Sequence, residues 1–205
     1  DVGELTQSRR GATGHSSSIS GYTAGGEQLP TPKFDTIDKF PFSSDTSATD
    51  VGELTLHTKS EAAGQSSSVS GYSSGGHAPG SLDTIEKFPF SSDTNATDVG
   101  QLSQARRLLA GTSSTTNGYT SGGCTPVIVN TIDKFPFAAD GAASDVGDLT
   151  SSRHYAAGQS SNESGYTSGG TSTDTIDKFP FANDNNATDV GELTQARQDV
   201  SGQQV

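Results

Sequence analysis

Ile85-Glu86-Lys87-Phe88-Pro89-Phe90 is one of four nearly identical hexapeptides in this chain of 205 residues. This Ile-(Asp/Glu)-Lys-Phe-Pro-Phe string begins at Ile37, Ile85, Ile132 and Ile176. A second string, Gly-Tyr-x-x-Gly-Gly, begins at Gly21, Gly71, Gly118 and Gly165. A third, Asp-Val-Gly-x-Leu-(Thr/Ser), begins at Asp1, Asp50, Asp98, Asp145 and Asp189, at spacings of 49, 48, 47 and 44 residues. Internal repeats of about 20–50 residues are typical of propellers, solenoids and other arrays.

The composition taken alone would indicate disorder, but the register of the aromatic residues opposes it. Leu, Ile, Val and Phe number 10, 6, 10 and 9, which is 35 of 205 residues or 17%. A value under roughly 20% with a high net charge is typical of disordered chains. However, 12 of the 14 aromatic residues fall in the repeated strings, and only Phe34 and Tyr155 do not. We therefore expect a folded array of similar units.

Each unit is expected to form about four short strands and no helix. Ser/Thr-rich runs follow Gly14, Gly64, Gly111 and Gly158, and each run leads into Gly-Tyr-x-x-Gly-Gly. Small residues and glycines are typical of strands that pack closely, and the proline in Phe-Pro-Phe indicates a strand end or edge. Val and Leu then alternate in the Asp-Val-Gly-x-Leu strand. Four strands in about 47 residues match one blade of a β-propeller.

The repeats resemble those of kelch-type propellers. The shared features are the glycine doublet after an aromatic residue (Tyr72 to Gly76), the later aromatic strand (Phe88 to Phe90), and a basic residue ahead of each blade. That basic column consists of Arg9, Lys59, Arg106, Arg153 and Arg197. Kelch blades usually carry a Trp, which this chain lacks, so Phe is expected to fill its place. The amino-acid sequences of the repeats are also similar to those of repeat proteins in marine bacteriophage (cyanophage) virions.

We predict one all-β repeat domain over residues 1–205, a propeller of four-stranded antiparallel blades with four blades. The units are about 1–49, 50–97, 98–144 and 145–188, with a partial fifth copy at 189–205. Four units and one further Asp-Val-Gly strand make 17 strands, so one copy lies outside a four-bladed ring. The alternative is five blades, completed by another chain or a longer array. A surplus strand could also pair with a neighbour and form homo-oligomers. Because the chain begins at Asp1 and has no Met, we expect a processed product or part of something longer.

Three repeated columns are the expected core of the blades. We expect the tyrosines to pack between blades rather than to stack on sugars, because all four are identical. The predicted core comprises Tyr22, Tyr72, Tyr119 and Tyr166; Phe40, Phe88, Phe135 and Phe179; and Leu54, Leu102, Leu149 and Leu193.

Function is expected in the loops that follow the glycine doublets. These loops have 10, 8, 8 and 5 residues, while the seven-residue link from Phe-Pro-Phe to Asp-Val-Gly stays constant. In a four-stranded blade they share a face with the crossings to the next blade, near the basic column. The predicted binding residues are therefore Arg9, Lys59, Arg106, Arg153, Glu27, His77, Cys124 and Thr171. The alternative is that these loops vary because nothing constrains them.

The sequence carries little that indicates catalysis or a metal. Asp45, Asp50, Asp93 and Asp98 place oxygens at alternate positions, as calcium loops do, but the glycine expected at the sixth position is missing. The four histidines (His15, His57, His77 and His154) have no metal spacing and are expected to be solvated in loops. Cys124 is the single cysteine, so no internal disulfide is possible. We expect no cofactor and no enzyme.

The net charge of the chain excludes some classes of binding partner. The formal net charge is −12 and the pI about 4.5. An acidic surface opposes binding to nucleic acids or anionic membranes, and no apolar run reaches the ~20 residues of a membrane span. We therefore expect a non-enzymatic structural or receptor-binding module, similar to an adhesin or tail fibre, in a virion or extracellular appendage. A lectin-like propeller with several weak sites is the alternative, so the expected partner is a cell-surface glycan or receptor.

Overall fold

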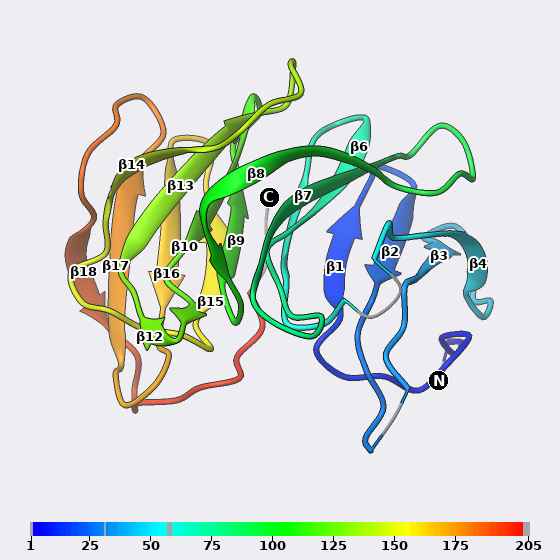
Figure 1. Ribbon diagram of the computed structural model, residues 1–205, viewed down its shortest axis with the longest axis horizontal. Helices are drawn as coiled ribbons and strands as arrows, with labels where there is room; N and C mark the ends of the chain where they lie inside the picture. The colour runs from blue at the N-terminus through cyan, green and yellow to red at the C-terminus, as the bar shows by residue number, and fades with distance from the viewer. Residues whose placement is uncertain (1, 31, 57–58, 203–205) are drawn as a thin grey trace.

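The computed structural model describes residues 2–30, 32–56 and 59–202, and 16 of its strands form four four-stranded antiparallel sheets (Figure 1). Blade 1 contains β1 (Thr13–Ser16), β2 (Ser20–Ala24), β3 (Thr36–Pro41) and β4 (Thr49–Glu53). Blade 2 contains β5 (Ala63–Ser66), β6 (Ser70–Ser74), β7 (Leu82–Pro89) and β8 (Thr97–Arg106). Blade 3 contains β9 (Ala110–Ser113), β10 (Asn117–Ser121), β13 (Thr131–Pro136) and β14 (Ser144–Asp148). Blade 4 contains β15 (Ala157–Ser160), β16 (Ser164–Ser168), β17 (Thr175–Pro180) and β18 (Thr188–Glu192).

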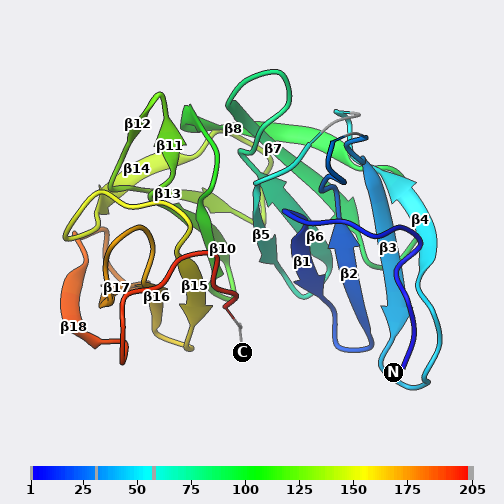
Figure 2. The same ribbon diagram turned by 90° about the horizontal axis from the view of Figure 1, so that it is seen from below.

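These sheets confirm the expected all-β propeller of four-stranded blades. The strands of each blade pair in chain order from the inside outward, and a small hairpin of β11 (Cys124–Thr125) and β12 (Val127–Ile128) is inserted in blade 3. The blades form an arc with blades 1 and 4 at its ends (Figure 2). No sheet closes on itself, and no hydrogen-bonded ladder joins blade 1 to blade 4 in the described part of the chain.

A glycine–phenylalanine pair across two strands explains the Gly-Tyr and Phe-Pro-Phe strings. Gly21 of β2 lies opposite Phe40 of β3, and a Cβ at Gly21 would lie 2.3 Å from the Phe40 ring. The same pair, at the same distance, recurs in the other three blades. The ring therefore lies over the backbone of its neighbour, where only glycine leaves room.

In blades 1 to 3, the tyrosine beside this glycine faces the next blade. Tyr22 stacks on Phe90 of blade 2, with ring centroids 4.8 Å apart and planes at 22°, and it also contacts Phe88. We call the side bearing Tyr22, Ile37, Val51 and Leu54 the tyrosine face of blade 1; its equivalents in blades 2 to 4 carry the same four residue types. The opposite side, bearing Phe88, Phe90 and Ala96 in blade 2, is the phenylalanine face. The tyrosine face of one blade and the phenylalanine face of the next form one apolar cluster at each of the three blade–blade interfaces.

The predicted core residues are buried wherever a neighbouring blade covers them. Those that are buried are Tyr22, Tyr72, Tyr119, Phe88, Phe135, Phe179, Leu54, Leu102 and Leu149. The prediction was wrong in degree at the ends of the arc, where Phe40, Tyr166 and Leu193 are only half-buried. Phe40 belongs to the phenylalanine face of blade 1, and the other two belong to the tyrosine face of blade 4. Their exposure follows from the lack of a neighbouring blade at these positions.

The first segment also differs from its expected form. Residues 2–6 form no strand, although they run beside blade 1, where Ala48 donates its N–H to the Glu4 carbonyl at 2.8 Å. Ala96 donates in the same way to Glu53 of β4, also at 2.8 Å. Residues 2–6 thus take the place that the outer strand of a preceding blade would occupy.

We expect Tyr119→Ala to lower the free energy of unfolding by about 3–5 kcal/mol, because it leaves a cavity between blades 3 and 4. Ile19→Ala, at a turn where the side chain is 71% exposed, should change it by less than about 0.5 kcal/mol. Urea denaturation followed by circular dichroism measures both. Equal effects of the two substitutions would contradict the packing assigned to the tyrosine column.

Candidate functional site

The variable loops gather at one end of the propeller, together with the crossings between blades. Each loop begins at the residue after a glycine doublet, and that residue bonds the backbone of the residue that follows the basic column. Glu27, His77 and Cys124 form β-bridges with Arg10, Ser60 and Arg107, and Thr171 donates its N–H to the His154 carbonyl. The first residue of each predicted loop is therefore fixed to the frame by its backbone. The loop residues beyond it vary in number and conformation.

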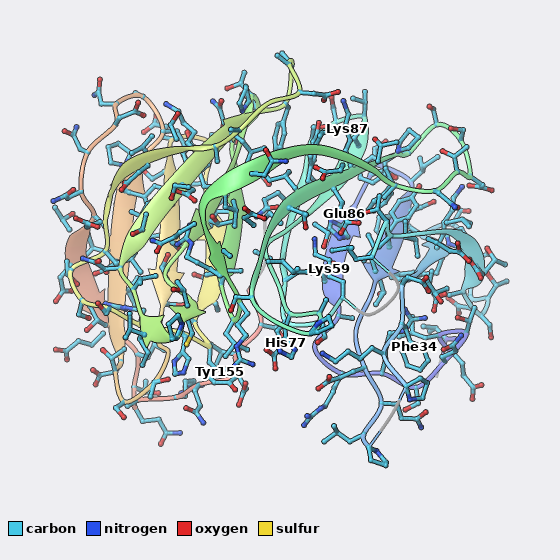
Figure 3. All side chains as sticks on the ribbon, in the orientation of Figure 1. Phe34, Lys59, His77, Glu86, Lys87 and Tyr155 are labelled. Atoms are coloured by element: carbon cyan, nitrogen blue, oxygen red, sulfur yellow. The ribbon has the colours of Figure 1, made fainter. Side chains whose placement is uncertain are left out.

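Charged side chains link the loops of blades 1 and 2 on this loop face. Glu27 accepts from Arg10 at 3.1 Å and lies 3.8 Å from Lys33. Lys33 donates its Nζ proton to Nδ1 of His77 at 2.7 Å. Because the Lys33 ammonium can only donate, Nδ1 of His77 is the acceptor and carries no proton. Burial lowers the pKa of His77, and the charges of Lys33 and Arg107 lower it further. Figure 3 shows Phe34, His77 and Tyr155 along this end and Lys87 at the opposite end.

The basic column does not reach the loop face, which corrects the expected binding site. Lys59, Arg106 and Arg153 are buried, and each pairs with an acidic residue in the third strand of the blade that follows it along the chain, as Arg9 does with blade 1. The four ion pairs are Arg9–Asp38 at 2.9 Å, Lys59–Glu86 at 2.7 Å, Arg106–Asp133 at 2.7 Å and Arg153–Asp177 at 3.0 Å. Lys59 and Glu86 point toward each other inside blade 2 (Figure 3). These side chains are buried in ion pairs inside the propeller and are not accessible to a ligand.

Each ion pair is accompanied by further hydrogen bonds, although the buried Nε of Arg106 has no partner among the described residues. Arg106 donates to the carbonyl oxygens of Gly122 and Thr131 at 2.7 and 2.9 Å. Asp133 accepts from both the N–H and the hydroxyl of Ser103. Ser103 is the last residue of an Asp-Val-Gly-x-Leu-(Thr/Ser) string, and Thr6, Thr55 and Thr150 bond their acids in the same way. The acidic partners were not predicted from the sequence, although Lys59 and Glu86 are the single exceptions in columns otherwise of Arg and Asp.

The inner strands line an open cavity on the inside of the arc, with a volume of about 1160 Å³, which we call the channel. Glycines line it where the strands approach, because a Cβ at Gly64 would lie 2.5 Å from the Gly14 carbonyl oxygen. Gly111, Gly158 and Gly202 continue this series, each against the previous glycine. The lining is composed of Ser, Thr, Gly, Ala, Leu, Val and Asn with His15. Such side chains offer hydrogen bonds to a ligand, but the lining holds no carboxylate or amine for acid–base chemistry.

A chain of backbone hydrogen bonds rims the channel at the loop face. Glu61, Leu108, Tyr155 and Asp199 occupy the same position in successive units as Gly11, and all five have φ between 56° and 63°. Each N–H donates to the carbonyl of the preceding member, from Glu61 to Gly11 through Asp199 to Tyr155, at 2.8–3.2 Å. The rim shows that residue 199 continues the spacing of the blades beyond blade 4.

His15 is a buried channel residue and not a solvated loop residue. Its Nδ1 lies 3.1 Å from the carbonyl oxygen of Gln65, which can only accept, so Nδ1 carries the proton and Nε2 accepts from Thr13 at 2.9 Å. Its ring meets Phe88 edge-on at 5.1 Å. Burial lowers the pKa of His15 to about 4. His77 and His154 are half-buried on the loop face, and His57 lies outside the described residues.

The aspartates considered for calcium serve turns and ion pairs. Asp50 and Asp98 accept the N–H of Gly52 and Gly100 at 3.1 Å, two residues further on. Asp93 accepts from Lys39 of the preceding blade at 2.9 Å, whereas Asp45 is exposed. In the described ranges, no three His, Cys, Asp or Glu side chains converge in a group suited to a metal ion. Nor does that part of the chain contain a helix with the length and hydropathy of a membrane crossing.

Comparison with known proteins adds no family to this picture. No protein-family model matches the chain, and no curated protein matches it. The resemblance to kelch and phage repeats therefore remains a prediction from the wording of the repeats.

We expect Arg106→Met to lower the free energy of unfolding by about 3–5 kcal/mol, because it leaves Asp133 charged and buried without its partner. Asp133→Leu should cost a similar amount, and the double variant should cost clearly less than the sum. Urea unfolding of the three variants and the parent gives the coupling free energy. Strictly additive losses would contradict a coupled buried pair.

We expect His15 to make stability fall as the pH is lowered from about 6.5 to about 4. In this window the unfolded ring binds a proton that the folded ring excludes, so protonation favours unfolding by up to about 3 kcal/mol. The His15→Gln variant has glutamine at position 15, as the chain does at the equivalent positions 65 and 159. It should therefore lack this contribution. The difference in unfolding free energy between parent and variant, measured by urea titration from pH 4 to 7.5, should therefore depend on pH. A constant difference would contradict the burial of a neutral ring.

Proposed function

We propose that this chain is a non-enzymatic binding module in which a rigid propeller presents variable loops to a receptor at one end. The observation that carries the proposal is that repeated positions and variable positions have different roles. The repeated aromatic, glycine, basic and acidic residues are used inside blades or between them. The loops after the glycine doublets differ in length and composition and lie together on the loop face.

The side chains on these loops suit recognition of a protein surface. Leu29 in the loop of blade 1 is 60% exposed, and Val127 in the hairpin of blade 3 is 66% exposed. Both lie on the same face as the charged network of Arg10, Glu27 and Lys33. Exposed apolar groups with charged residues nearby are typical of protein interaction sites.

The lectin alternative has less support from the site. Sugar-binding sites commonly use an open aromatic ring as a platform, and Tyr22, Tyr72 and Tyr119 are buried between blades. We therefore propose a protein receptor and keep glycan binding as an outcome of the test. The wording of the repeats, which resembles that of marine bacteriophage virion proteins, supports a virion or another extracellular appendage as the setting.

The test replaces the loop 124–131, in blade 3, with the shorter loop 171–175 of blade 4. We expect the urea midpoint to change little, because shortening a surface loop alters the entropy of its closure only slightly. Binding of the fluorescently labelled chain to a panel of bacterial cells, cyanobacteria included, should be saturable and should weaken in the loop variant. Val69→Ser, at an exposed turn on the opposite face, is the matched control and should leave binding unchanged.

Treatment of the cells separates the possible receptors. Binding that is abolished by protease but not by periodate supports a protein receptor. Binding that is abolished by periodate indicates the lectin alternative. If no cell type binds the chain, or if the loop variant binds as tightly as the parent, the proposed role of the loop face is wrong.

A further inference from the structure

We propose that the two ends of the arc bind a second copy of this chain, head to tail, so that two copies form one closed ring. The tyrosine face of blade 4 and the phenylalanine face of blade 1 are the two halves of an interface that the chain already contains three times. This inference concerns assembly and does not depend on the identity of a receptor.

Each internal interface joins two blades by a stacked aromatic pair, an ion pair and a backbone bond. Tyr119 of blade 3 stacks on Phe181 of blade 4 at 4.9 Å. A lysine of the Lys-Phe-Pro-Phe strand pairs with an aspartate in the turn of the next blade, as in Lys39–Asp93, Lys87–Asp140 and Lys134–Asp184. The outer strand offers a carbonyl to an alanine N–H of the next blade, as in Ala187 to Asp148 at 2.8 Å.

Blade 4 presents the first half of this interface without a cover. Tyr166 and Ile176 are half-buried, whereas Ile37, Ile85 and Ile132 in the internal interfaces are buried. Val190 is 51% exposed. Lys178 lies 5.8 Å from the Tyr166 ring centroid, and it makes no ion pair with any described residue.

Blade 1 presents the second half. Phe40 is half-buried, although its counterparts Phe88, Phe135 and Phe179 are buried. Phe42 is 57% exposed, whereas its counterparts Phe90, Phe137 and Phe181 are half-buried. Asp45 occupies the position of Asp93 and Asp140 and likewise pairs with no described cation. A lysine–aspartate pair between Lys178 of one copy and Asp45 of the other would therefore match the three internal pairs in charge and position.

The segments at the two ends are interchangeable, which allows a second copy to fit. Residues 189–197 and 1–9 are identical at 8 of 9 positions, differing at Ala196 and Ser8. Residues 2–6 lie on blade 1 where β18 of another copy would lie, and residues 195–202 lie on blade 4 where residues 8–14 of another copy would lie. In the dimer, β18 of one copy would replace residues 2–6 of the other, and residues 8–14 would replace residues 195–202. Each segment is thus replaced by one of nearly the same sequence, as in a domain swap. The gain comes from covering Tyr166, Val190 and Phe42 and from the new ion pair.

The shape of the arc favours two copies. Blades 1 and 4 lie on opposite sides of the inner strands (Figure 2), so a second arc can face the first across the channel. Four blades from each copy make eight, which is within the range of about 4–8 blades in known propellers. A head-to-tail interface closes into a ring when its rotation permits and otherwise continues as a fibre.

The test combines native mass spectrometry with zero-length cross-linking of the 205-residue chain. We expect a species of twice 21.0 kDa at micromolar concentration. A carbodiimide should join Lys178 to Asp45, and in an equal, equilibrated mixture of ¹⁴N- and ¹⁵N-labelled chains about half of this product should carry one label of each kind. The Lys39–Asp93, Lys87–Asp140 and Lys134–Asp184 products form within one chain and are the internal controls.

Charge exchange checks that the proposed pair is the one that forms. Lys178→Asp should weaken dimerisation by roughly tenfold through repulsion from Asp45, and Lys178→Asp with Asp45→Lys should restore most of it. Val69→Ser removes an exposed apolar side chain away from both end faces and should have no effect. Unchanged urea midpoints, measured below the concentration at which dimers form, show that the variants fold.

Three results would overturn the proposal. The first is a monomer at every concentration up to the solubility limit. The second is a Lys178–Asp45 product found only within single chains, which would mean that one copy closes its own ring. The third is an open series of trimers and larger species, because a closed two-copy ring has no free end.

Discussion

Blades 1 to 3 each depend on the next blade to cover their tyrosine. The Tyr–Phe stack at each interface gathers the few large apolar residues into three clusters, and no blade has a sufficient apolar core of its own. This arrangement explains how a chain with 17% Leu, Ile, Val and Phe can fold. It also explains the half-buried rings at both ends of the arc, because an end blade has one face without a neighbour. The stability of the array is therefore a sum of interface terms.

The remaining interior is polar, and its polar groups are mostly paired, the exceptions among the described side chains being Ser73 Oγ, Arg106 Nε and the Tyr119 hydroxyl. The third strand of each blade carries the acid of one ion pair, such as Arg106–Asp133 with both side chains fully buried, and serines and threonines supply the additional hydrogen bonds. A buried ion pair contributes little net stability, but losing one partner is costly. The pairs therefore tie the crossing before a blade to its third strand and fix how the crossing enters. The glycines of the inner strands act together with them, since the channel walls are set by backbone contact.

The fold could be predicted from the sequence to a large extent, and the site only in part. The spacing of Gly-Tyr and Phe-Pro-Phe indicated the strands and the packing of Tyr22, Tyr72 and Tyr119, because identical residues in register require identical surroundings. The basic column was misplaced, since proximity to a crossing along the chain does not show which way a long side chain points. The Lys59–Glu86 exception in columns of Arg and Asp could have revealed the pairing. Nothing in the sequence around His15 indicated burial, which depends on Phe88 of another blade.

The placement of each charge pair has a consequence for how such an array can evolve. A unit counted from one Asp-Val-Gly string to the next holds Thr6, Arg9 and Asp38 together, although these residues come from an outer segment, a crossing and a third strand. Gene duplication or unequal crossing-over in the turn ahead of that string adds or removes one blade together with both residues of its ion pair. Recombination between Lys59 and Glu86 would instead combine a lysine with an aspartate, or an arginine with a glutamate, and mismatch their reach. The number of repeat units can therefore increase or decrease during evolution, while the loops change in sequence independently.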